Sequence, residues 1–221
     1  MALKLSDIKK NKEVLAAIRE SDKALEILGY TEHGLRHLDV VSDRAQEIAK
    51  SIGMIEREIE LSGMAAFCHD MGNFMGRTKH HYWAAILFRQ IFGGAIEPDE
   101  MVTVMQAIAN HDKEEMKFTN KVSAVLVIAD KSDVHQSRVR NQPIEQTMMD
   151  IHDRVNYAVT DSSIKVDRKE KTITLALTIN TDLVSIIEYF EIFTERMSYC
   201  RKAAEYLGYK FSLVMNDFKL S

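Results

Sequence analysis

Glycine and proline are scarce in this chain of 221 residues, which contains nine glycines and two prolines. So few turn-forming residues favour helices over a fold of many short turns. The two cysteines, Cys68 and Cys200, lie far apart in the sequence. We expect both to be reduced, buried thiols of an intracellular chain.

Long apolar runs and basic tracts are also missing. No stretch approaches the roughly 18 apolar residues of a membrane span, and the first residues lack the apolar run of a signal peptide. The net charge is −4 and the pI is about 6.1. We therefore expect a cytoplasmic chain whose partners include neither a membrane nor a nucleic-acid polymer.

What the sequence does contain is enough apolar material, 46% of residues, for a sizeable core. Its length suits one domain, or one domain with a small appendage. Apolar residues recur with a period of 3.6 and predict a helical body, with glycines ending several of the helices. The predicted helices cover residues 5–29, 31–52, 56–70, 80–92, 99–112, 120–140 and 144–159.

The pattern changes near residue 160. Residues 162–179 alternate between apolar and polar side chains, which predicts a β-hairpin that turns at residues 167–171. A long helix over residues 181–208, capped by Thr181 or Asp182, and a third strand at 210–216 are expected to follow. We predict a mainly α fold with a C-terminal α+β extension, divided into domains 1–160 and 161–221.

Three His-Asp dipeptides occur, at residues 69–70, 111–112 and 152–153, so the dipeptide alone identifies nothing. The first ends the apolar run "GMAAFC", where a buried Asp70 without a cation would cost several kcal/mol. A divalent metal would remove that cost. In the second we expect His111 to point inward and its aspartate outward. We expect the third at the surface or in a packing contact with the tail.

Other potential ligands stand at comparable places. Asp130 follows the apolar run "AVLVIA", His80 begins a helix, and His37 begins a stripe that faces the core. Imidazole and carboxylate groups together suit Fe, Mn, Co, Ni or Zn rather than Ca. Six such groups exceed the ligands of one catalytic zinc and would suit two metals bridged by a carboxylate. Such a pair can hold a hydroxide nucleophile and clamp the oxygens of a phosphoryl group.

The order of these residues over about residues 30–140 resembles that of the HD-domain metal-dependent phosphohydrolases. The stretch "HLDVVSDRAQEIA" is similar to that family's first-ligand helix, "AAFCHDMGN" to its central motif and "VLVIADKSD" to its final aspartate motif. Histidines in "HHYWAAIL" and "AIANHD" look like the additional ligands of the two-metal branch. The spacing in the first of these favours His80 over His81. The family's fold is an all-α bundle.

The resemblance implies a ligand set for two divalent first-row ions, with Asp70 as the bridging, catalytic residue. The first ion would be held by His37, His69, Asp70 and Asp130, and the second by Asp70, His80 and His111. It implies a phosphohydrolase that cleaves a phosphomonoester or phosphoanhydride of a small molecule, with a nucleotide favoured. A di-iron oxygenase with the same ligands and a non-catalytic metal-binding signalling domain are the alternatives.

One position departs from the family pattern. Several subfamilies carry a titratable residue three positions after the central aspartate, where this chain has Asn73. Asn73 could orient a phosphate oxygen or a water, while a metal-bound water, His33 or His81 could donate the proton.

Cations near the motifs could bind a small phosphorylated substrate, or could be ordinary solvated charge. The candidate substrate-binding residues are Asn73, Arg77, Lys79, Lys131 and His33. The long helix of the tail carries a wide apolar face, which could be core against the hairpin, a lid or the surface of a homodimer.

Overall fold

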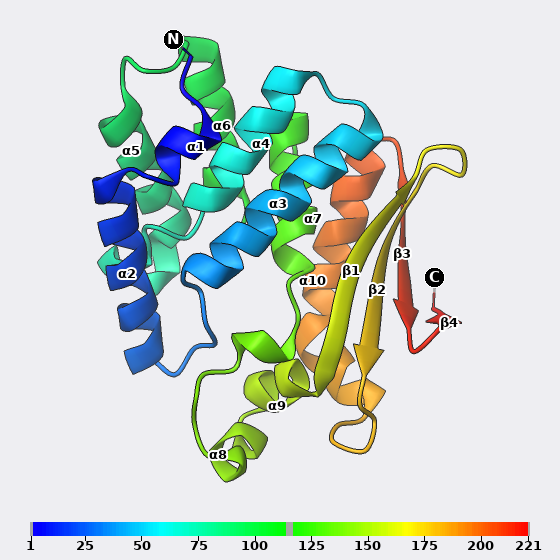
Figure 1. Ribbon diagram of the computed structural model, residues 1–221. Helices are drawn as coiled ribbons and strands as arrows, with labels where there is room; N and C mark the ends of the chain where they lie inside the picture. The colour runs from blue at the N-terminus through cyan, green and yellow to red at the C-terminus, as the bar shows by residue number, and fades with distance from the viewer. Residues whose placement is uncertain (1, 114–116, 221) are drawn as a thin grey trace. The chain divides into compact units, whose positions relative to one another are not determined.

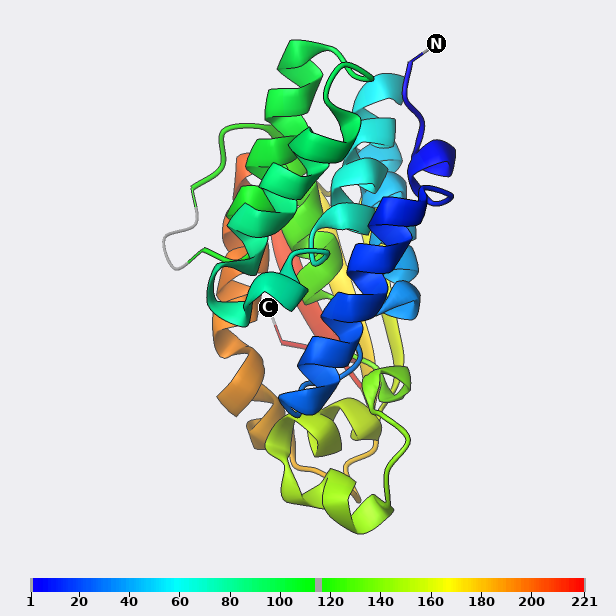
Figure 2. The same ribbon diagram turned by 90° about the vertical axis from the view of Figure 1, so that its left-hand side faces the viewer.

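The computed structural model describes residues 2–113 and 117–220 (Figures 1 and 2). Its internal contacts divide the chain into two compact units, Met1–Asp130 and Lys131–Ser221. The expected mainly α fold with a C-terminal α+β extension is confirmed. The division into domains 1–160 and 161–221, expected from the sequence, stays a prediction. None of the described helices is both long and apolar enough to cross a membrane.

The first unit is built from helices joined by short loops, with two 3₁₀ turns between the fourth and fifth helices. They are α1 (Leu5–Ile8), α2 (Lys12–Ile27), α3 (Leu35–Ile52), α4 (Glu56–Cys68), η1 (Asn73–Met75), η2 (Arg77–Lys79), α5 (His80–Phe92), α6 (Pro98–Asn110) and α7 (Lys121–Lys131). The single helix expected over residues 5–29 is wrong, because the side chain of Asn11 accepts hydrogen bonds from the backbone of Glu13 and Val14. That cap starts a new helix.

Helix α4 lies at the centre of this unit. It packs against both α3 and α6, and every residue from 61 to 68 is buried. A helix that is buried all round delivers the residue after its last turn into the protein interior. The buried end of α4 therefore places His69 and Asp70 in the core rather than at the surface.

The loop after α4 comes very close to the start of α5. A Cβ atom on Gly72 would overlap the carbonyl oxygen of His80 and the backbone nitrogen of Ala84. Both obstacles are backbone atoms, which cannot rotate away. Only glycine therefore allows this approach, which brings the N-terminus of α5 next to the end of α4.

The second unit combines short helices with a four-stranded sheet. Its elements are η3 (Gln136–Arg138), α8 (Ile144–Met149), α9 (Ile151–Ala158), β1 (Val159–Asp167), β2 (Thr172–Ile179), α10 (Ile186–Tyr206), β3 (Lys210–Met215) and β4 (Phe218–Lys219). The strand order is β1-β2-β3-β4. Strands β1 and β2 form the predicted antiparallel hairpin, and α10 connects β2 to β3 in parallel.

Several sequence expectations for this unit are wrong at the element boundaries. The helix expected over 120–140 ends at Lys131, and the one over 144–159 is split where Asp150 caps α9. The long helix starts later than expected, because Ser185 and Glu188 form a capping box. Strand β4 was not expected.

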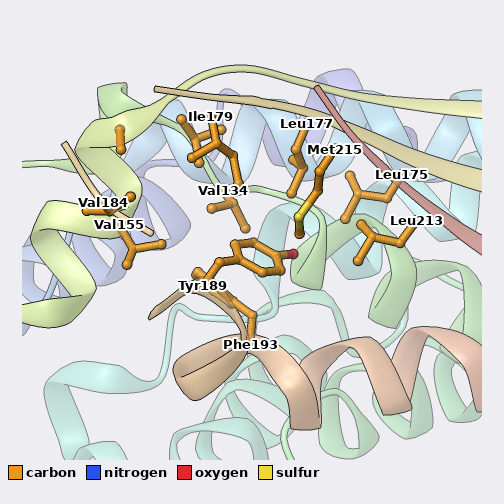
Figure 3. Packing of buried hydrophobic residues seen from close by; sticks show 12 residues of the cluster. Val134, Val155, Leu175, Leu177, Ile179, Val184, Tyr189, Phe193, Leu213 and Met215 are labelled. Carbon is orange, nitrogen blue, oxygen red and sulfur yellow. The ribbon is translucent and has the colours of Figure 1, made fainter. Parts of the chain in front are cut away.

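One face of α10 packs against the sheet (Figure 3). Tyr189 and Phe193 are fully buried at the centre of a cluster that includes Leu175, Leu213 and Met215. The predicted apolar face of the long helix is therefore core against the hairpin and β3. Cys200 of the same helix and Cys68 of the first unit are buried thiols, as expected.

Candidate metal centre

Six predicted ligands come from five helices of the first unit, mostly at helix ends. They are His37 in α3, His69 and Asp70 after α4, His80 at the start of α5, His111 after α6 and Asp130 in α7. All but Asp130 are buried, and the Asp130 side chain is only 11% exposed. Their side chains converge on one place in the interior of the unit.

The two carboxylate oxygens of Asp70 face different histidines. Its Oδ2 lies 3.3 Å from Nε2 of His69 and 3.9 Å from Nε2 of His37. Its Oδ1 lies 3.1 Å from Nε2 of His80 and 3.7 Å from Nε2 of His111. Asp70 therefore stands between two sets of imidazoles.

Asp130 completes the set on the Oδ2 side. Its Oδ1 lies 3.5 Å from Nε2 of His37 and 3.6 Å from Nε2 of His69. We call His37, His69, Asp70 and Asp130 the first ligand group, and Asp70, His80 and His111 the second ligand group. Separations of this size are those between neighbouring ligands of one ion with bonds of about 2.0–2.2 Å.

The histidine tautomers show that a cation fits these groups. In His69, His80 and His111, Nδ1 lies 2.6–2.7 Å from the backbone carbonyl oxygen three residues earlier. A carbonyl only accepts, so each Nδ1 carries a hydrogen, and each ring in its neutral form presents an Nε2 lone pair to the centre. The Nε2 atoms of His80 and His111 are 3.1 Å apart. A cation between them would stabilise lone pairs and carboxylates that face one another.

The electrostatics of the site also favour a cation. Burial alone would raise the pKa of Asp70, but His69, His111 and His80 hold it well below its usual range. Burial alone would lower the pKa of His69, but the carboxylates of Asp70 and Asp130 raise it to about 10. The buried Nε2 of His69 is close to both carboxylates but makes no well-formed hydrogen bond within residues 2–113 and 117–220. The centre thus attracts positive charge, as a metal-binding site must.

Asn73 is hydrogen-bonded to Asp70 rather than directed at open space. Its Nδ2 donates to both the backbone oxygen and Oδ1 of Asp70, at 2.9 Å each. Its Oδ1 accepts a hydrogen bond from Arg77 at 3.3 Å. The amide therefore links the central carboxylate to a cation.

Arg77 and Asp112 lie beside the second ligand group. The Nη1 atom of Arg77 is 3.0 Å from Nε2 of His80, and its Nη2 is 3.4 Å from Oδ2 of Asp112. Asp112 was expected to point into solvent, but its Oδ2 is also 3.8 Å from Nε2 of His80. The place of Asp112 directly after His111 indicated that it could lie near the site. The charged residues that follow it in the sequence favoured a solvent-exposed position instead.

The remaining histidine candidates differ in their placement. The ring of His33 is half-buried and 5.4 Å from that of His37. His81 is buried, its Nδ1 has no hydrogen-bond partner, and it belongs to none of the candidate ligand clusters among the described residues. The structure therefore brings His80, rather than His81, to Asp70.

The two lysine candidates also differ. Lys79 is exposed, and its Nζ lies 5.9 Å from the ring centroid of Tyr82. Lys131 is buried directly after Asp130, and contacts assign it to the second unit. Tyr30, which sequence reasoning missed, has its ring 5.6 Å from Cζ of Arg77.

Comparisons with known proteins agree with this geometry. A family model described as "HD domain" matches residues 34–158. An uncharacterized protein of Methanocaldococcus jannaschii is 26% identical over 213 residues, covering 86% of this chain and 81% of the relative. The matched segment includes every residue of both ligand groups. The chain belongs to the HD domain family, whose members are mostly metal-dependent phosphohydrolases.

Proposed function

We propose that this chain is a metal-dependent phosphohydrolase that cleaves a phosphomonoester or phosphoanhydride of a small molecule, with a nucleotide as the favoured substrate. The observation that carries the proposal is the position of Asp70, whose two oxygens each face a different ligand group. A carboxylate in that position can bridge two ions. The first and second ligand groups would each hold one divalent first-row ion.

The bound ions would supply Lewis acidity toward phosphoryl oxygens and would make a water nucleophilic at neutral pH. The chain's own residues fix the geometry of this site. Asn73 holds Asp70 through Oδ1, and the backbone carbonyls behind His69, His80 and His111 hold their rings. Such contacts orient the ligands, and the carbonyls that accept from Nδ1 also increase the basicity of the three histidines.

Arg77 and Lys79 supply positive charge for an anionic substrate. The guanidinium of Arg77 can bind two phosphate oxygens at once, and Lys79 is an exposed cation two residues further along the same turn. His33 can move a proton at Nε2, because its Nδ1 lies 2.6 Å from the carbonyl oxygen of Thr31 and so carries a hydrogen. We assign to His33 the protonation of the leaving group.

The test is a phosphate-release assay on the full chain. Protein purified without oxygen is analysed for metal, stripped, reloaded with Mn²⁺ and offered a panel of nucleotides and phosphomonoesters under nitrogen. The proposal expects turnover in the wild type and neither turnover nor bound metal in Asp70→Ala. Full activity in that variant would refute the assignment of the site.

The same assay separates the alternatives. Oxygen uptake by the iron form without phosphate release would replace the proposal with the di-iron oxygenase. Retained metal without turnover on any substrate, with Mn, Fe, Co or Ni, would favour the metal-binding signalling domain.

A further inference from the structure

The Arg77 side chain reaches the inner part of the second ligand group. Its Nη1 lies 3.0 Å from Nε2 and 3.1 Å from Nδ1 of His80, and 3.9 Å from Oδ1 of Asp70. A position almost equally far from both ring nitrogens lies over the face of the imidazole. The guanidinium therefore leaves the Nε2 lone pair directed at Asp70, but it places a permanent positive charge beside it.

The same side chain also has contacts on its outer side. Its Nη2 is 3.4 Å from Oδ2 of Asp112, and its Cζ is 5.6 Å from the ring centroid of Tyr30. The Arg77 side chain is 27% exposed and that of Asp112 is 33% exposed, so these contacts lie toward solvent. Arg77 is thus held from two sides: by Asn73, His80 and Asp70 inside, and by Asp112 and Tyr30 outside.

The two ligand groups differ in charge, because they differ in their carboxylates and in their distance from Arg77. The first group contains two carboxylates, those of Asp70 and Asp130. The second shares only Asp70, and Arg77 stands against it. Like charges a few ångströms apart in a largely buried site repel strongly. An ion in the second group must therefore overcome the charge of the guanidinium or displace it.

We propose that Arg77 controls loading of the second ligand group and couples it to the binding of an anion. An ion in the second group repels the guanidinium from its inner contacts, and Asp112 and Tyr30 retain it at the rim. There its donors face solvent and can bind a phosphate group of the substrate. This inference rests on the proposed function, because it takes two ions and a phosphorylated substrate as given.

Thermodynamic linkage makes the coupling reciprocal. If the second ion frees Arg77 to bind phosphate, then phosphate must raise the affinity for the second ion. Arg77 approaches the first ligand group through the shared Asp70, at Oδ1, the oxygen that faces the second group. The affinity of the first group should therefore depend little on this residue. Both statements concern binding and can be tested without turnover.

The experiment measures Mn²⁺ binding to the metal-stripped full chain by titration calorimetry and by paramagnetic resonance of free Mn²⁺. Arg77→Met is compared with wild type and with Arg89→Met, which makes the same charge change on the exposed side of α5. We expect Arg77→Met to bind the second ion at least tenfold more tightly, with the first ion unchanged. Arg89→Met should match the wild type.

A second arm adds inorganic phosphate. Phosphate should raise the affinity for the second ion in the wild type, and this increase should be several-fold smaller in Arg77→Met. Arg77→Gln, which loses the charge but keeps a hydrogen-bond donor for Asn73, should behave like Arg77→Met. Agreement between the two variants, which differ in hydrogen-bonding capacity, would attribute the effect to the lost charge.

Unchanged or weaker binding of the second ion in both Arg77 variants would overturn the inference and reduce Arg77 to a support for His80. A wild type that binds one ion and variants that bind two would support it. Binding of one ion per chain in the wild type and in every variant would overturn the inference, but it would remain consistent with an ion in the first ligand group. Failure of every protein to bind Mn²⁺ would refute the proposed function as well.

Discussion

Asn73 donates its side-chain amide to Oδ1 and to the backbone oxygen of Asp70, at 2.9 Å each. The two residues are three positions apart, directly after the end of α4. This pair of hydrogen bonds restrains the rotamer of Asp70, so that Oδ1 faces the second ligand group and Oδ2 the first. An amide can donate to the carboxylate and accept from Arg77 at the same time, which neither lysine nor glutamate can do.

Asn73→Ala should therefore lower activity or metal affinity by about 10–100-fold, the usual loss when a contact behind a metal ligand is removed. Met75→Ala in the same turn is the control, because Met75 is half-exposed. Steady-state rates and metal content of both variants provide the measurement. Wild-type values for Asn73→Ala would show that the hydrogen bonds to Asp70 do not matter.

Single ligand substitutions should remove different numbers of ions. Asp70→Ala should prevent binding in both ligand groups, because its two oxygens face both. His80→Ala should remove only the second ion and His81→Ala neither, since His81 lies outside the ligand clusters. Metal content per chain after gel filtration checks this. Loss of one ion in His81→Ala with none lost in His80→Ala would reverse the ligand assignment.

Gly72→Ala should damage both stability and the second ligand group. The new Cβ would overlap backbone atoms of α5, and forcing such an overlap costs about 1–3 kcal/mol or more. The shift would move His80 away from Asp70, so affinity for the second ion should fall.

Gly29→Ala is the matched control for this prediction. Gly29 has a positive φ, +78°, but nothing lies within 4 Å of its Cβ position. The substitution should cost about 1–2 kcal/mol for the left-handed backbone alone and leave metal binding intact. Urea denaturation measures the free energy of unfolding of both variants, and Mn²⁺ titration measures their metal affinity. Equal metal affinity in the two would contradict the role of Gly72.

The first unit should lose stability in acid, because the ion pair between Arg57 and Glu100 is lost when Glu100 is protonated. Nε and Nη2 of Arg57 donate to the two carboxylate oxygens at 2.8 and 2.6 Å. The hydrogen bond from Arg57 lowers the pKa of Glu100, against a smaller opposite effect of burial. The stabilisation is therefore present above the unfolded pKa of about 4.3 and is lost as pH falls through the lower, folded pKa.

Glu100→Gln should accordingly cost about 1 kcal/mol at pH 7, because the pair is about a quarter exposed, and little in acid below the folded pKa of Glu100. Denaturation curves at the two pH values test this. A double-mutant cycle with Arg57→Met isolates the pair from other effects. A loss that stays the same at both pH values would mean that the charge of Glu100 contributes nothing.

The helices that were predicted well have clear local signals at both ends. Helix α5 begins at His80 after a loop with two glycines and ends before Gly93, as the apolar period suggested. The missed breaks depend on single side chains. Asn11 and Asp150 each accept hydrogen bonds from two backbone N–H groups, which outweighs the continuing apolar period.

The candidate site divides in the same way. The chemical types and order of the six candidate ligands could be predicted, because a carboxylate or imidazole at the end of an apolar helix is costly to bury unless it is paired or binds a metal. Asp112 was misplaced, because its position beside Arg77 depends on two loops that are far apart in the sequence. Contacts between distant segments leave no local pattern to read.

The sequence by itself determined a helical body, an α+β tail and the residue types of a candidate metal centre. These follow from the spacing of apolar residues and from the cost of burying charge, which act within one helix at a time. Only the tertiary structure decided which oxygen of Asp70 faces which histidines, and that Arg77 stands against His80. Those relationships depend on how α4, α5 and α6 pack together, and ångström differences in that packing decide which atoms meet.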